Sequence, residues 1–198
     1  MTETKPSPAS ESSIAQRRKA QVLEAAAECF RRRGFHRSSM AQISAAAGMS
    51  SGHIYHYFKS KEDIIAAIVE RERSEIELII DRMRQAPTPA DSIALFLDHI
   101  PEGVALHKNA SRASLTMEIL AEASRNPEIA RVVQQNDQTI HQSMTELFQD
   151  DSPKTRSRLE IMSALMEGLS VRALRNPECD KDIDLDMLRD TFFHLLKY

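Results

Sequence analysis

The sequence predicts an all-α protein of about nine helices, with a small N-terminal helix-turn-helix domain followed by a larger helical domain. Apolar residues recur every three or four positions along most of the chain. Prolines and glycines separate these stretches, and no stretch alternates apolar and polar residues as a half-buried strand does. The chain has 198 residues, 41% of them hydrophobic, which is enough for a sizeable buried core.

The N-terminal part predicts a tail and three helices. Residues 1–13 are rich in Ser, Thr, Glu and Pro, and we expect them to form a disordered tail. A first helix is predicted over 14–33, with Gly34 as its stop. Ser39 and Ser50 are placed to cap two short helices that are separated by the stretch AAGMS, which is the spacing of a helix-turn-helix.

The rest of the chain predicts six helices. Ser60 caps a long amphipathic helix that ends near Met83, and the later helices are expected at about 90–107, 111–125, 127–149, 153–175 and 183–197. Pro101 and Gly103 fall inside the first of these, so we expect a kink or an early end there. We therefore expect two domains, at 14–60 and 61–198.

The two parts of the chain differ in charge. Residues 14–61 contain nine basic and two acidic residues (9 − 2 = +7), whereas residues 62–198 contain 16 basic and 25 acidic residues (16 − 25 = −9). A basic module joined to an acidic one is typical of a nucleic-acid reader with a separate control domain. The alternative is that these are simply two solvated faces of opposite sign.

Several other classes of protein lack their signals in this sequence. No stretch is apolar and long enough to cross a membrane, and the N-terminus lacks the apolar core of a secretory signal, so we expect a cytoplasmic protein with no membrane partner. No nucleophile, phosphate-loop or zinc-protease motif is present, so we expect neither an enzyme nor a cofactor. His53 and His56 lie three apart, but no further ligand is near them, so we expect no metal.

The second helix of the helix-turn-helix carries the residues suited to DNA. Ile54 and Phe58 lie four apart and are expected to face inward. The hydrogen-bonding side chains of Ser51, His53 and His56 then project outward, where they can meet base edges in a major groove.

Residues 14–70 resemble the DNA-binding region of the TetR (tetracycline repressor) family of bacterial transcription regulators. The match is carried by GFHRSSMAQISAAAGMSSGHIYHYFKSKEDII. The resemblance implies phosphate contacts from Ser39, Ser50, Tyr55, Tyr57 and Lys61, and base contacts from Ser51, Gly52, His53 and His56, with Gln42 as a further candidate. Position 57 is Tyr where many members have His, and its hydroxyl can serve the same phosphate.

The resemblance also implies that the acidic domain binds an effector and forms a homodimer through its last two helices. Ligand contacts are expected from residues on or beside apolar stripes, several of them adaptable methionines: Phe96, His107, Met117, Glu118, Met162, Met166 and Glu167. Dimer contacts are expected from the apolar stripes of the last two helices: Leu159, Met162, Ser163, Met166, Leu169, Leu185, Leu188, Phe192 and Leu195. The alternative is that these stripes serve only the core of one chain.

We therefore expect a ligand-responsive repressor that a small-molecule inducer releases from a palindromic operator in double-stranded DNA. A transcriptional activator of the same fold is the main alternative, because nothing in the sequence decides between them. An architectural DNA-binding protein is a weaker alternative, because it would need basic charge over the whole surface.

Overall fold

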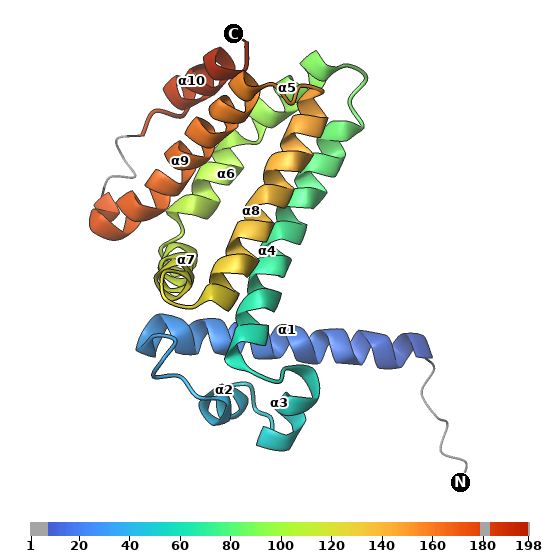
Figure 1. The fold of residues 1–198 in the computed structure, drawn as a ribbon, viewed down its shortest axis with the longest axis vertical. Helices are drawn as coiled ribbons and strands as arrows, with labels where there is room; N and C mark the ends of the chain where they lie inside the picture. Colours follow the sequence, from blue (N-terminus) through green and yellow to red (C-terminus); the bar gives the residue numbers. More distant parts are fainter. Residues whose placement is uncertain (1–7, 179–182, 198) are drawn as a thin grey trace. The chain divides into compact units, whose positions relative to one another are not determined.

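The computed structural model describes residues 8–178 and 183–197, and this part of the chain is helical without strands (Figure 1). The helices are α1 Pro8–Arg33, α2 Met40–Ala46, α3 Ser51–Tyr57, α4 Lys61–Arg84, α5 Pro89–Asp98, α6 Ile100–Lys108, α7 Ala110–Ala123, α8 Pro127–Phe148, α9 Pro153–Arg175 and α10 Leu185–Lys197. The all-α prediction is confirmed, with ten helices in the described ranges rather than about nine.

The difference in number comes from the break between α5 and α6. Pro101 has no N–H to donate and lies in the first turn of α6, so one continuous helix over 90–107 cannot form. His99 ends α5, and its N–H is bonded to the carbonyls of Leu95 and Phe96. Gly103 follows in α6, where an added Cβ would lie 3.1 Å from Cε of Met166 on α9. The break was expected, and the glycine allows α6 to approach α9 closely.

The helix α1 begins earlier than the sequence indicated. It starts at Pro8, six residues before the predicted start at residue 14, and residues 1–7 lie outside the described part. The chain divides into two compact units, 1–68 and 69–198, and the division lies inside α4 rather than at its start.

The first unit holds α1, α2, α3 and the start of α4 around a small core. Val22 and Phe30 of α1 are buried in it, as are Ile43 of α2 and Ile54 of α3. Burying such a side chain contributes about 1.5–3 kcal/mol, so each short helix is stabilised mainly by its inward face.

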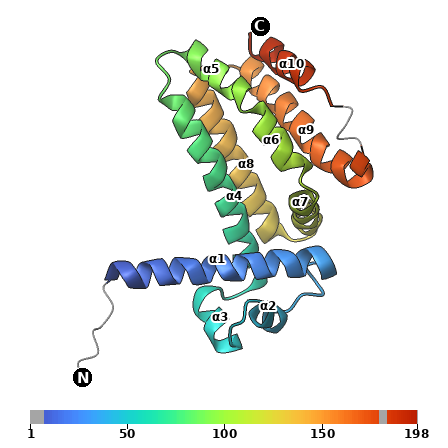
Figure 2. The same cartoon turned by 180° about the vertical axis from the view of Figure 1, so that it is seen from behind.

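The second unit packs the rest of α4 with α5 to α10 (Figures 1 and 2). One core cluster includes Ile80 and Met83 of α4 with Leu147 of α8, and a second joins α5, α6, α9 and α10 around Phe192. No helix among the described residues is both long and apolar enough to span a bilayer.

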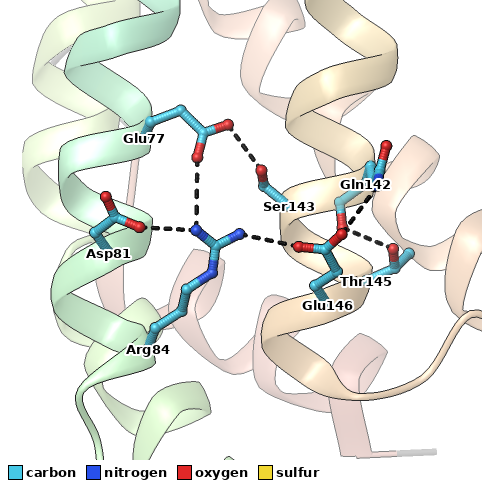
Figure 3. A network of polar contacts seen from close by, with 7 residues as sticks. All are labelled: Glu77, Asp81, Arg84, Gln142, Ser143, Thr145 and Glu146. Atoms are coloured by element: carbon cyan, nitrogen blue, oxygen red, sulfur yellow. Dashed lines mark hydrogen bonds and ion pairs between the residues drawn. The ribbon is translucent and has the colours of Figure 1, made fainter.

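A polar network joins α4 to α8 beside the first core cluster (Figure 3). The guanidinium of Arg84 lies 2.7 Å from the Asp81 carboxylate on its own helix and 3.4 Å from the Glu146 carboxylate on α8. The hydroxyl of Ser143 donates to Glu77 at 2.7 Å. Because these bonds cross between the two helices, they fix the register of α4 against α8.

Candidate nucleic-acid interface and ligand cavity

The turn between α2 and α3 is built by a glycine in the left-handed region. Gly48 has φ +62°, its N–H donates to the carbonyl of Ala45 at 3.1 Å, and the N–H of Met49 donates to Ser44 at 2.8 Å. This pair of bonds is a Schellman motif, which closes α2 and redirects the chain. The side chain of Gln21 in α1 donates to the carbonyl of Ala47 at 2.7 Å and ties the turn to α1.

The two expected capping serines lie at the starts of these helices. The Ser39 hydroxyl accepts the N–H of Gln42 at 3.2 Å, and the Gln42 side-chain oxygen accepts the N–H of Ser39 at 2.9 Å. The Ser50 hydroxyl accepts the N–H of His53 at 3.3 Å. These three DNA-binding candidates thus have a structural role, and the serine O–H donors and the Gln42 amide N–H₂ remain to bind a phosphate or base.

The outer face of α3 is exposed and polar. Ser51, Gly52, His53 and His56 are exposed, while Ile54 is fully buried. Tyr55 also points outward and is 53% exposed. Apart from its own stretch of helix backbone, no described atom lies within 4 Å of a Cβ added to Gly52, so packing in this part of the chain does not require a glycine there. The arrangement leaves room for an outside molecule to approach the backbone at the start of α3.

Two aromatic side chains of α3 are held against each other. The Nε2 atom of His53 lies 3.2 Å from the Tyr57 hydroxyl, and the two rings stack with centroids 5.4 Å apart and an interplanar angle of 20°. The ring of His56 also contacts Tyr57, edge-on, with ring centroids 5.3 Å apart. The Tyr57 hydroxyl is therefore already bonded to a base-contact candidate, which the sequence did not predict.

Lys61 also has a partner within the chain. Its ammonium donates to the carbonyl of Phe35 at 2.6 Å and lies 4.0 Å from the centroid of the Phe35 ring. An ammonium has three N–H donors, so this bond leaves donors for a phosphate. The interaction also gives Lys61 a part in holding the first unit together.

The second unit encloses a cavity of about 400 Å³, which lies in the size range of small-molecule sites. Its wall is mostly apolar and comes from α4 to α10, with five methionines, Phe96 and Phe192 among the lining residues. Six of the seven residues that the sequence proposed as ligand contacts line it: Phe96, His107, Met117, Met162, Met166 and Glu167. The seventh, Glu118, does not line the cavity.

The cavity contains polar groups that the sequence analysis missed. Arg112 lies 3.7 Å from Glu72 and 3.0 Å from Glu75, so its charge is matched within the chain. Burial raises the pKa of Glu72, against the lowering effect of Arg112. Glu72 lies in the charged run ERERSE, which reads as a solvated helix face. No local signal distinguished its inward carboxylate from its neighbours.

Other lining groups come from α6, α8 and α9. His107 Nδ1 lies 3.0 Å from the Ser170 hydroxyl, and burial, together with Arg112, lowers the pKa of this imidazole. Asn136, Asp137 and His141 line the cavity from α8. The spacing of Asp137 and His141, four residues apart on one helix face, was a signal that the sequence analysis could have used.

One group of side chains within the described ranges could hold a metal ion. Ligand atoms of Asp137, His141 and Glu160 all lie within 4.8 Å of one another. Asp137 and Glu160 are exposed. His53 and His56, which were weighed as ligands from the sequence, do not belong to this group.

Within the single chain, most residues that the resemblance gave as dimer contacts lie on the inward faces of α9 and α10. Leu159, Met162 and Phe192 are buried in the core of the same chain, and Met166, Leu169, Leu188 and Leu195 pack against that core. Ser163 lies 3.5 Å from His141 of α8. Of the expected set, Leu185 is an exposed apolar residue, and the others that α9 and α10 expose are Ile161, Leu165, Val171, Leu174, Met187 and Phe193. Both helices have two apolar faces, and the predicted stripe is mainly the inward one.

Two family models match the chain. Residues 22–68 match the N-terminal model of bacterial regulatory proteins of the tetR family, and residues 104–196 match the C-terminal model of BetI-type transcriptional repressors. Together they match part of each unit, and residues 69–103 lie between the two matches.

Named relatives agree with these matches. The HTH-type transcriptional regulator UidR of Escherichia coli strain K12 is 31% identical over 157 residues, which cover 78% of this chain and 76% of UidR. The HTH-type transcriptional regulator BetI of Stenotrophomonas maltophilia is 26% identical over 159 residues, covering 78% and 80%. Among solved structures, Salmonella enterica GusR matches with a TM-score of 0.72 and 26% identity over 91% of this chain and 96% of GusR.

Proposed function

Because the chain belongs to the TetR family of bacterial regulatory proteins, we propose that it is a repressor which a small-molecule inducer releases from a palindromic operator. The observation that carries this proposal is the exposed polar face of α3, presented by a capped turn and a buried Ile54. The family models and named relatives describe regulators, and we assign no enzymatic activity to the chain.

DNA binding divides between two kinds of contact. The outward residues Ser51, His53 and His56 are suited to base edges, and Gly52 allows close approach of the backbone. Tyr55 and the capped N-termini of the short helices are suited to phosphates, which position the protein without reading the sequence. The +7 charge of residues 14–61 adds attraction for the DNA backbone.

The inducer acts through α4. This helix begins in the first unit at Lys61, and its later residues Ile76, Ile80 and Met83 line the cavity. With 24 residues it is about 36 Å long. A ligand that repacks the cavity side of α4 changes the preferred position of the whole helix. A ligand that stabilises the form unable to bind DNA by a few kcal/mol is enough to empty the operator.

A homodimer supplies the two reading helices that a palindrome requires. We propose that the exposed apolar residues of α9 and α10 form its interface, centred on Leu165, Met187 and Phe193.

Light scattering is expected to report twice 22.4 kDa. Met187→Glu should shift the mass toward the monomer, because Met187 is 67% exposed in the single chain and would be buried between two copies. Leu78→Glu is the matched control, because Leu78 is similarly exposed, at 61%, but lies on α4. A parent protein that stays monomeric on DNA would contradict the dimer.

Selection from a random pool of double-stranded DNA tests the regulator itself. The ligand-free full-length protein should enrich one palindromic sequence, and transcription from a promoter that overlaps this sequence should fall when the protein is added. Since the protein acts on DNA, we place it in the bacterial cytoplasm. If no DNA sequence is enriched, the proposed operator is refuted. If transcription rises instead of falling, the protein is an activator and not a repressor.

A further inference from the structure

The cavity of the second unit has more negative than positive charge in its wall. Its acidic lining residues are Glu72, Glu102, Asp137 and Glu167. Among the described residues that line it, Arg112 alone is an arginine or lysine, and this guanidinium is already matched by Glu72 and Glu75. The lowered pKa of His107 keeps this imidazole neutral at physiological pH. The wall therefore offers no unmatched arginine or lysine to an anionic ligand.

The negative charge is concentrated where α8 meets α9. Asp137 on α8 and Glu160 on α9 both raise the pKa of the Glu167 carboxyl, in addition to the effect of burial. In the described part of the chain no lysine or arginine forms an ion pair with these three carboxylates. The imidazole of His141 lies within 4.8 Å of the Asp137 and Glu160 carboxylates. A bound cation beside this group would reduce the repulsion among the three carboxylates.

A buried acceptor lies next to this group. The side-chain oxygen of Asn136 is buried and has no hydrogen-bond donor among the described residues, and Asn136 lines the cavity. An unsatisfied buried acceptor is costly, so it favours a ligand that brings an N–H or O–H group. This observation is independent of the charge and favours a ligand with a hydrogen-bond donor, whether that donor is neutral or cationic.

The rest of the wall suits an apolar body. Phe96 and Phe192 line the cavity with their rings stacked at 6.3 Å, and the five methionines add adaptable apolar surface. The negative faces of aromatic rings also attract cations. A volume of about 400 Å³ limits the ligand to a small molecule.

We propose that the inducer is a small organic cation, a protonated amine or amidine on an apolar body, with its N–H groups toward Asn136, Asp137 and Glu167. This inference rests on the proposed role of the cavity as the inducer site. It excludes carboxylates, phosphates and sulfates as the main inducers of this protein.

Calorimetric titration of the full-length protein with three probes tests the proposal. The probes 3-phenylpropylammonium, 3-phenylpropan-1-ol and 3-phenylpropionate share one body and differ in the charge of the head group. At pH 7.5 the ammonium should bind about tenfold more tightly than the alcohol, since one charge-assisted hydrogen bond contributes about that factor. The carboxylate should bind most weakly.

Two variants locate the head group. Glu167→Gln and Asp137→Asn should each weaken ammonium binding about fivefold to tenfold, and should weaken alcohol binding by a smaller factor because the alcohol has no charge. Asp190→Asn is the matched control, because it removes one exposed acid of α10 that does not line the cavity. It should change neither affinity.

Several results would overturn the proposal. Equal affinities for ammonium and alcohol, preference for the carboxylate, or no ammonium binding at millimolar concentration would each exclude an organic cation. Tight binding of Mn²⁺ alone that His141→Ala removes, without ammonium binding, would make the acidic group a metal site instead. The selection of DNA by the ligand-free protein does not depend on the head group of the inducer. If that selection fails, the proposed role as a regulator is refuted, but the inference about the charge of the ligand is not.

Discussion

Tyr57→Phe distinguishes two roles for one hydroxyl. The family resemblance assigns this hydroxyl to a phosphate, whereas the structure bonds it to His53 Nε2 at 3.2 Å on the exposed face of α3. An exposed hydrogen bond contributes about 0.5–1 kcal/mol, and phenylalanine retains the ring stack, so folding should be little affected. Without this bond His53 is no longer held in position. The discrimination at the base pair that His53 contacts should then fall by about 1–3 kcal/mol, which is more than the loss of folding stability.

The assay is fluorescence anisotropy on the selected operator and on variants with one base pair changed at a time. Tyr57→Phe and His53→Ala should relax discrimination at the same base pair, and the double variant should resemble His53→Ala there. Tyr55→Phe is the control. The Tyr55 side chain is 53% exposed and has no hydrogen-bond partner within the described ranges, so this change should weaken binding to every operator alike. If Tyr57→Phe also weakens all operators equally and keeps their ranking, Tyr57 is a phosphate contact and the orienting role is refuted.

Three further substitutions test other parts of the chain. Gly52→Ala should raise folding stability by up to about 1 kcal/mol through helix propensity, and should lower operator affinity; a rise in both would show that DNA does not approach this backbone closely. Lys61→Ala should lower stability by about 1–2 kcal/mol, because the Phe35 carbonyl loses its donor, and should reduce the salt dependence of DNA binding by about one unit; urea unfolding and anisotropy at several salt concentrations measure the two effects. Glu167→Gln should raise the melting temperature by about 1 °C at pH 7.5, because the raised pKa means that the ionised carboxyl is disfavoured in the folded state; the gain should vanish below pH of about 4, where the carboxyl is protonated in both states, and a gain that persists there would contradict the charge repulsion.

The helix-turn-helix was predictable because its signals are local. A capping serine accepts the backbone N–H three residues later, a glycine makes the turn, and apolar residues lie four apart. Each of these signals acts over one or two helical turns. Ser39, Ser50, Gly48 and Ile54 therefore lie where the sequence placed them. The partner of Tyr57 was not predicted, because a spacing of four residues permits a contact without choosing the rotamer that makes it.

The second unit was less predictable because its long helices have apolar residues on two sides. On α9, Leu159 and Met162 face the core, while Ile161 and Leu165 are exposed. Helical periodicity identifies both faces, but the choice between them depends on which helices pack on each side. The same limit hid Glu72, since an inward carboxylate and a surface carboxylate look alike in one sequence.

The five methionines of the cavity, out of nine in the chain, have an evolutionary consequence. Unbranched thioether side chains change rotamer at little cost, so the wall can accept a new shape without a rearrangement of the backbone. Substitutions among apolar residues of similar volume cost less than about 1.5 kcal/mol in a core. Inducer preference can therefore diverge through a few changes in this wall while α3 keeps the same operator. The ligand that the regulator binds and the genes that it controls can then evolve independently.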